Sequence, residues 1–206
     1  MAYGSYSVNA TIGGIQISET ITRQGDHPNP YEISLAVAST GTVTNRTNNV
    51  LTDVTLSGGH GLTNGTYDCF FTGGVRYGLT GAITSNTMTL SGGAGDDFPA
   101  NNATCQVSKV TAINTAIDGD EIELIAIELK SQNTTTTKVG HVKFMDSGNN
   151  TIAEIDLVEN TPRVWDIAGG AANAFTGNPI THAEAAMNDT ALTATLYIAS
   201  LEDSTP

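Results

Sequence analysis

The residues with the clearest potential for chemistry lie in SGGAGDDFPA, residues 91–100, where three glycines precede the adjacent carboxylates Asp96 and Asp97. Glycine and aspartate at such spacing occur in repeats that bind calcium, but those repeats work by stacking copies that share each ion. This chain holds one copy, and no EF-hand frame is present. We therefore interpret the stretch as a turn whose Asp side chains cap backbone N–H groups, with adventitious calcium as the alternative. We expect no required metal and no other cofactor.

Catalytic frames are missing from the sequence. None of its four histidines lies in a recognisable nucleophile–base pattern; they are His27, His60, His141 and His182. His60, in GGHGL, is best explained as a turn residue with its ring hydrogen-bonded to the backbone. Glu121 and Glu123 would share one face of a strand, so a glycosidase-like pair is conceivable, but no aromatic cleft accompanies them. The sequence therefore predicts a protein that is not an enzyme.

Two cysteines, Cys69 and Cys105, lack the C-x-x-C or histidine spacing of a zinc site. They could be two buried thiols in strands. They could also form a disulfide that closes a loop of roughly 35 residues and contributes about 3–4 kcal/mol.

The charge distribution argues against two classes of partner. The chain has 21 acidic and 8 basic residues, a net charge of −13, and no two basic residues are adjacent. Phosphate backbones and anionic lipids both require clustered Lys and Arg. We therefore expect no nucleic-acid partner and no membrane partner. No run of about 18 apolar residues and no signal-peptide pattern occurs, so we expect a protein that is not exported by the usual route.

The elements that would position these residues are predominantly strands. Residues 5–22 alternate around a Gly-Gly break and predict a hairpin, 25–30 predict a rigid proline loop, and 31–39 predict a half-buried strand. Short strands separated by glycine-rich turns then indicate a small barrel or compact sandwich. These strands are expected at 50–56, 66–71, 75–84, 86–91 and 104–110.

The remaining third of the chain has longer periodic segments. Residues 120–131 are apolar on both faces, as in a central strand of a sandwich. Residues 138–146 and 151–159 flank SGNN and predict a hairpin. One helix is expected at 180–187, with Thr181 as N-cap and Glu184 at the capping-box spacing. A closing strand, 191–200, is expected to pair with an N-terminal strand.

Together these patterns predict a mainly β fold of sandwich or barrel units with few short helices. We expect residues 1–42 and 111–206 to form one sandwich-like domain. Residues 43–110 would then be an inserted barrel-like module.

The segment FFTGGVRYGLTG, residues 70–81, is a candidate contact surface. Phe70 and Phe71 point to opposite faces of a strand, so one of them could lie at an interface, and Arg76 and Tyr77 belong to residue types enriched at binding hot spots. The alternative is a hairpin packed internally.

Residues 60–100, HGLTNGTYDCFFTGGVRYGLTGAITSNTMTLSGGAGDDFPA, resemble a module of tailed-bacteriophage virion proteins. The shared features are the His-Gly-Leu turn, the aromatic strand, Gly-Gly-x-Arg-Tyr-Gly and Gly-Gly-x-Gly-Asp. The resemblance implies a structural virion component such as a capsid decoration (cement) protein. It transfers no catalytic residue.

This resemblance sets the expected location and partners. The protein would be made in the host cytoplasm and would bind the capsid exterior, contacting the major capsid protein and copies of itself, with a trimer as a candidate state. The expected contact residues are Tyr3, Tyr6, Phe71, Arg76 and Tyr77. The alternative is a tail, fibre or tail-tube component, with carbohydrate binding as a further option.

Overall fold

The protein is described by a computed structural model over residues 2–12, 15–25, 27–130, 138–175, 179–191 and 194–203, with side chains described in these ranges from Tyr31 onward. All sixteen elements are β-strands, which confirms the mainly β prediction. No helix long and apolar enough to cross a membrane occurs in the described ranges.

Six strands close a barrel in the order β4-β5-β8-β7-β6-β9. They are β4 (Ser39–Asn48), β5 (Leu51–Leu56), β6 (Gly65–Phe71), β7 (Gly74–Thr84), β8 (Thr87–Gly95) and β9 (Thr104–Lys109). Five of them match strands expected from the sequence, whereas β4 was not predicted. The alternation of each strand places one set of side chains in the barrel core; this core includes Val43, Val54, Tyr67, Cys69, Leu79, Leu90, Cys105 and Val107.

Two four-stranded antiparallel sheets form the second unit, which we call the sandwich. One has the order β10-β15-β12-β13 and the other β14-β11-β16-β3. Their bounds are β3 (His27–Ser34), β10 (Thr111–Ile117), β11 (Ile122–Lys130), β12 (Val139–Met145), β13 (Thr151–Val158), β14 (Arg163–Asp166), β15 (Ile180–Met187) and β16 (Thr195–Glu202). Both sheets contribute to one apolar core; its members include Ile125, Ile127, Val142, Phe144, Phe175, Ala183, Leu196 and Ile198.

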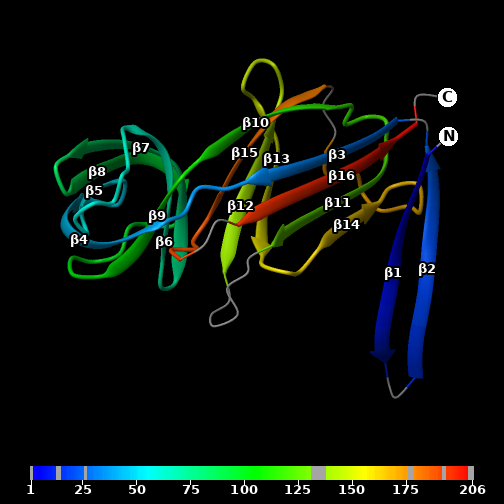
Figure 1. Ribbon diagram of the computed structural model, residues 1–206, viewed down its shortest axis with the longest axis horizontal. Coiled ribbons are helices and arrows are strands. Elements are labelled where there is room, and N and C mark those ends of the chain that lie inside the picture. Colours follow the sequence, from blue (N-terminus) through cyan, green and yellow to red (C-terminus); the bar gives the residue numbers. More distant parts are fainter. Residues whose placement is uncertain are drawn as a thin grey trace.

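The strand order explains how the two units are connected. The barrel strands are continuous in sequence, whereas β3 from before the barrel shares a sheet with β16 from the end of the chain. The closing strand therefore pairs with an N-terminal strand, as expected. β11 lies between β14 and β16, which confirms its central position, and β12 and β13 form the hairpin predicted around SGNN. In Figure 1 the barrel and the sandwich lie side by side along the long axis.

Two sequence predictions are wrong in informative ways. Residues 27–30 belong to strand β3 rather than to a loop; β3 pairs only with β16, and an edge strand tolerates Pro28 and Pro30 because its outer N–H groups bond no neighbour. Residues 180–187 form β15 rather than a helix. β15 pairs on both sides, with β10 and β12, so burial between two strands overrides the local helix preference of its alanines.

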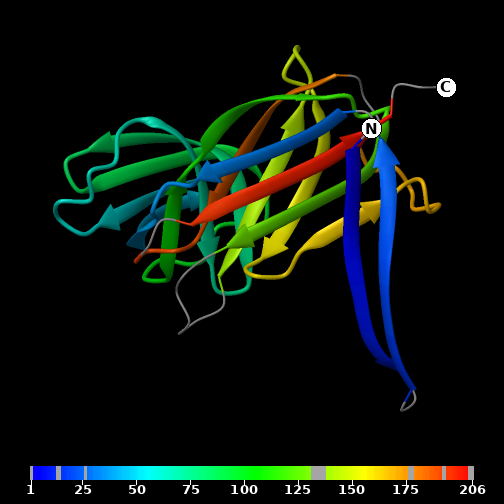
Figure 2. The ribbon, with the colours of Figure 1, turned by 45° about the vertical axis from the view of Figure 1, so that its right-hand side comes forward.

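The remaining two strands, β1 (Ala2–Ile12) and β2 (Ile15–Gly25), pair only with each other in an antiparallel hairpin, as predicted. Both ribbon views show this hairpin extending away from the sandwich (Figures 1 and 2). Its contacts with the body involve β3, β11 and β16. We call β1 and β2 the arm.

Candidate functional site

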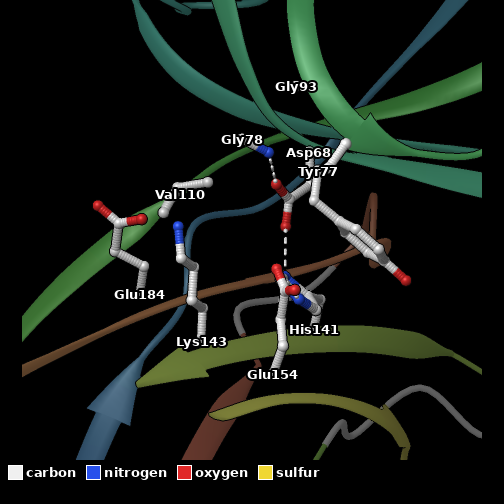
Figure 3. A pocket seen from close by; sticks show the side chains of 10 residues that line it. Asp68, Tyr77, Gly78, Gly93, Val110, His141, Lys143, Glu154 and Glu184 are labelled. Atoms are coloured by element: carbon white, nitrogen blue, oxygen red, sulfur yellow. Dashed lines mark hydrogen bonds and ion pairs between the residues drawn. The ribbon is translucent and has the colours of Figure 1, made fainter. Parts of the chain in front are cut away.

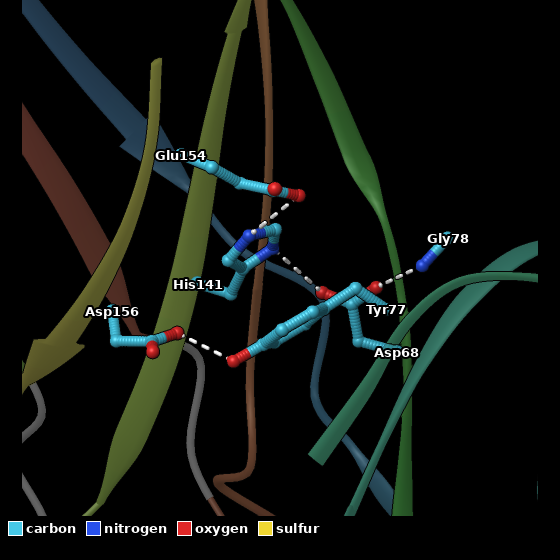
Figure 4. A network of polar contacts seen from close by, with 6 residues as sticks. All are labelled: Asp68, Tyr77, Gly78, His141, Glu154 and Asp156. Atoms are coloured by element: carbon cyan, nitrogen blue, oxygen red, sulfur yellow. Dashed lines mark hydrogen bonds and ion pairs between the residues drawn. The ribbon is translucent and has the colours of Figure 1, made fainter. Parts of the chain in front are cut away.

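The most distinctive polar cluster lies where the barrel meets the sandwich. We call it the junction and define it by Asp68 on β6, Tyr77 on β7, His141 on β12, and Glu154 and Asp156 on β13. His141 and Asp156 are cross-strand partners, and Glu154 lies two positions before Asp156 on the same strand. The junction therefore joins two strands of the barrel to one hairpin of the sandwich (Figure 4).

A bulge in the barrel turns Asp68 towards the junction. Tyr67 pairs with Leu79 and Cys69 pairs with Arg76, so Asp68 alone stands opposite two residues of β7. One of those two is Gly78, whose φ of 63° is accessible to glycine without strain. The Gly78 N–H donates a hydrogen bond of 2.9 Å to Asp68 Oδ1.

His141 lies between two carboxylates that come from different units. Its Nδ1 is 3.4 Å from Asp68 Oδ2, and its Nε2 is 3.2 Å from Glu154 Oε1, although the latter contact lacks hydrogen-bond directionality. Asp68 and His141 are 2% and 5% exposed, whereas the Glu154 side chain is 45% exposed. The Asp68–His141 pair is thus the buried part of the junction, and Glu154 closes it on the solvent side.

Tyr77 completes the junction by stacking on the imidazole of His141, with ring centroids 3.8 Å apart and planes inclined by 20°. Its hydroxyl donates a 2.6 Å hydrogen bond to Asp156 Oδ1. Burial, followed by this bond to a carboxylate, raises the pKa of the Tyr77 phenol well above its ordinary value. Tyr77 therefore remains a neutral donor at physiological pH.

A cavity of about 200 Å³ opens beside the junction (Figure 3). Asp68, Tyr77, His141 and Glu154 line it together with Val110, Lys143, Glu184 and the glycine-rich end of β8. No serine, threonine or cysteine lies among the lining residues of this cavity. Within the described ranges, no group of three or more His, Cys, Asp or Glu side chains could hold a metal ion. The geometry fits a polar connection between the two units.

The glycine-rich stretch of β8 surrounds a cation that belongs to the protein itself. The Arg76 guanidinium donates hydrogen bonds of 2.8 to 3.3 Å to four backbone carbonyls, those of Gly92, Gly93, Gly95 and Asp96. Gly92, Gly93 and Gly95 have positive φ, which aims successive carbonyl oxygens at one point. Strand β8 extends through Gly95 and pairs with β7, so the first half of the turn expected at residues 91–100 is part of a strand.

The carboxylates that follow this stretch agree only in part with the prediction that they cap backbone N–H groups, because Asp96 accepts from a backbone N–H and Asp97 accepts from a side-chain amide. Asp96 Oδ2 accepts a 3.0 Å hydrogen bond from the Val75 N–H, and Asp97 Oδ2 accepts one of 2.6 Å from Asn49 Nδ2. The predicted role of His60 is also confirmed, since its Nδ1 accepts from the Leu62 N–H and its Nε2 lies 3.1 Å from the Ser85 carbonyl oxygen.

The expected contact residues have different surroundings in the structure. Arg76 is 5% exposed and lies 5.8 Å from the ring centroid of Phe98, so its contacts are internal to the barrel. Tyr77 serves the junction, and Phe71 is partly buried against the barrel core. Tyr3 and Tyr6 lie on β1, where side chains are outside the described part of the structure. These positions favour the internally packed hairpin for residues 70–81.

The two cysteines lie on neighbouring barrel strands. Cys69 and Cys105 are both fully buried and are free thiols in the structure. A hydrogen bond with the Cys105 thiol, followed by burial, raises the pKa of Cys69, so Cys69 does not offer a reactive thiolate to solvent. The structure thus agrees with the first of the two alternatives drawn from the sequence.

Sequence reasoning missed the junction as a unit. Its residues come from strands of the two different units, and Tyr77 and Asp156 are 79 positions apart in the sequence. The available signal was a charged or polar residue within an apolar strand, namely Asp68 in YDCFF and His141 in VGHVKFM.

Comparisons with known proteins add no relative. No family model, no curated protein and no solved structure matches this chain.

Proposed function

We propose that this chain is a structural virion protein that decorates and stabilises the outside of a tailed-phage capsid through protein–protein contacts. The observation that carries the proposal is the arm, a two-stranded hairpin that extends away from an all-β body (Figure 2). An isolated hairpin is at best marginally stable in water. An arm of this kind would gain stability by packing against a neighbouring protein, and a protein shell offers such neighbours.

The body supports the same proposal through the polar contacts that connect its two units. Barrel and sandwich have separate apolar cores, and the junction fixes one against the other through a buried Asp68–His141 contact and the Tyr77–Asp156 bond. A protein that bridges shell subunits must hold two contact surfaces at a constant separation. The resemblance of residues 60–100 to a virion module falls on the barrel, which is one of these two units.

Charge and surface composition are compatible with this role. An excess of acidic residues, 21 against 8 basic ones, disfavours binding to packaged nucleic acid and keeps free subunits from aggregating. The carbohydrate alternative requires aromatic side chains displayed on a sheet face. All aromatic residues with described side chains are buried or partly buried, so they provide no such platform. Many copies on one shell would also compensate for a modest single contact through avidity.

The test uses particles of the phage whose genome encodes this chain. Labelled protein is mixed with purified DNA-filled heads and, separately, with purified tails, and each mixture is sedimented. We expect saturable binding to heads, together with lower resistance to heat of heads prepared without the protein. Cryo-electron microscopy of the particle then locates the density. Binding to tails alone, or density inside the shell, would reject the decoration proposal and favour the tail alternative.

A further inference from the structure

The arm has two chemically different faces. Cross-strand partners lie on the same face of an antiparallel pair, and three such pairs are apolar on both strands: Tyr6 with Ile21, Ala10 with Ile17, and Ile12 with Ile15. The alternate pairs belong to the opposite face. Four of them are polar on both strands, Ser5 with Thr22, Ser7 with Thr20, Asn9 with Ser18, and Thr11 with Gln16, and the fifth joins Tyr3 to Gln24. The arm is therefore an amphipathic ribbon.

No third strand pairs with the arm in the described part of the chain, and the arm meets the body through β3, β11 and β16 near its base. A ribbon with one apolar face needs a second layer to cover that face. Stacked β layers pack about 10 Å apart through interdigitating apolar residues. The arm thus forms one layer, and a second layer is needed to cover its apolar face.

The charge distribution indicates what supplies the other half. Residues 1–25 contain one acid, Glu19, and one base, Arg23, so their net charge is −1 + 1 = 0 in a chain of net charge −13. The remaining residues carry the whole excess of negative charge, which opposes close approach of two copies elsewhere on the surface. The arm is the segment through which copies can meet without this repulsion.

We propose that the apolar face of the arm packs against the same face of the arm of a second copy of this chain. Two arms stacked face to face form a four-stranded, two-layer structure with an isologous interface, in which one patch serves both copies. The Val8–Glu19 and Gly4–Arg23 pairs interrupt the apolar face, each with one charged residue of opposite sign. The inference deepens the proposed function, because it rests on that proposal for contacts between copies and assigns them a surface.

The size of the interface sets the expected strength. Strands of 11 residues at about 3.3 Å per residue give a face roughly 36 Å long and about 10 Å wide, or on the order of 360 Å² per copy. This lies below the roughly 800 Å² per partner of a stable complex. We therefore expect reversible, concentration-dependent association in solution, which attachment to a common shell would strengthen.

The experiment compares two adjacent substitutions that add the same charge to opposite faces. Ile17→Lys places a cation on the apolar face, and Ser18→Lys places one on the polar face. Sedimentation velocity over a concentration series should show the wild type and Ser18→Lys associating alike, while Ile17→Lys remains a monomer. Ile21→Lys and Thr20→Lys repeat the comparison at a second position. Thermal unfolding followed by Trp165 fluorescence should be the same for all four, since Trp165 lies against the sandwich core.

The outcomes separate this inference from the proposed function. A wild type that stays monomeric at its highest soluble concentration would overturn the contact between arms, as would equal losses in Ile17→Lys and Ser18→Lys. If such a monomer still binds heads, and removal of residues 1–25 abolishes that binding, the arm contacts the shell and the decoration proposal stands. If the arms associate as described but no virion fraction binds the protein, the decoration proposal fails and the contact between arms stands.

Discussion

Arg76 and His141 are buried basic side chains that the protein holds in opposite ways. Arg76 is surrounded by four backbone carbonyls from residues 92–96, at the end of β8 and directly after it, so these contacts are all within the barrel. His141 lies between the carboxylates of Asp68 and Glu154, and Asp68 comes from the other structural unit. The first arrangement completes the barrel, and the second connects the barrel to the sandwich.

This difference has an energetic consequence. Backbone carbonyls cannot move away without distorting their strand, so the loss of Arg76 leaves several partly buried acceptors without their charged donor. The carboxylate of Asp68 keeps the Gly78 N–H and borders a cavity of about 200 Å³, so it has partial compensation when its partner is lost. We therefore expect the two sites to differ in both the size and the type of effect.

The largest expected effect follows removal of the guanidinium. Arg76→Met should destabilise the protein by about 4 kcal/mol, because four carbonyls lose their donor and a buried contact with Phe98 is altered. Arg76→Lys should recover less than half, since an ammonium lacks the planar fork. Urea unfolding measures both. Arg163→Met, at an exposed position of β14, is the control and should change stability by less than about 0.5 kcal/mol. A loss below about 1 kcal/mol in Arg76→Met would contradict the comparison.

The second expected effect concerns the connection between the units. His141→Phe preserves the stacking with Tyr77 but leaves Asp68 without its partner, which should cost about 2–3 kcal/mol. Because Trp165 is the only tryptophan and packs in the sandwich, its fluorescence follows that unit, while far-UV circular dichroism follows both. The two unfolding midpoints should coincide in the wild type and separate in His141→Phe.

A double variant provides the control for this effect. Asp68→Asn together with His141→Phe removes the unpaired buried charge, so it should be more stable than His141→Phe alone by at least about 1 kcal/mol. Midpoints that remain coincident in both variants would show that the junction does not hold the units together.

A smaller effect is expected from the phenol at the edge of the junction. Tyr77→Phe removes the hydrogen bond to Asp156 and should cost about 1 kcal/mol at neutral pH. The folded-state pKa of Tyr77 lies above the ordinary value of 10.0, so its contribution is complete below pH 10.0 and is lost as pH rises towards the folded pKa. Urea unfolding at neutral pH and at a series above 10.0 should show a shallower decline for Tyr77→Phe.

The pH dependence needs its own control. Burial also raises the pKa of Tyr67, against a smaller lowering by the Thr63 carbonyl, so part of the alkaline decline belongs to the barrel core. Tyr67→Phe should therefore reduce the same decline independently. Identical slopes in the wild type and both variants would contradict the assignment.

The same contrast explains what the sequence could predict. The arm, the β12–β13 hairpin and the bond from the Leu62 N–H to His60 depend on contacts between residues close in sequence, which alternation and turn residues indicate. The helix expected at 180–187 failed because β10 and β12 flank that segment, a fact set by residues far away in sequence. The junction could not be predicted for the same reason, since no residue near Asp68 in the sequence indicates that His141 is its partner. The role of Arg76 lies between these cases, because its acceptors are within 20 positions but require the positive φ values of β8.

The smallest expected effect concerns calcium, because residues 91–97 have the glycine and aspartate spacing of a calcium loop. We expect calcium to leave the stability of the wild type unchanged. The carbonyl oxygens of Gly92, Gly93, Gly95 and Asp96, which a calcium ion would use, already accept hydrogen bonds from Arg76. A divalent cation would have to displace a buried guanidinium and would meet its repulsion at short range. The melting temperature of the wild type should therefore be the same in excess calcium and in EDTA.

Arg76→Met provides the sharper comparison, because the carbonyls that Arg76 occupied and the nearby Asp96 carboxylate are then available to a cation. Any stabilisation by calcium should appear in that variant and not in the wild type. A rise of the wild-type melting temperature in calcium, reversed by EDTA and absent in Asp96→Asn, would show that Asp96 is a metal ligand and that Arg76 does not fill the site.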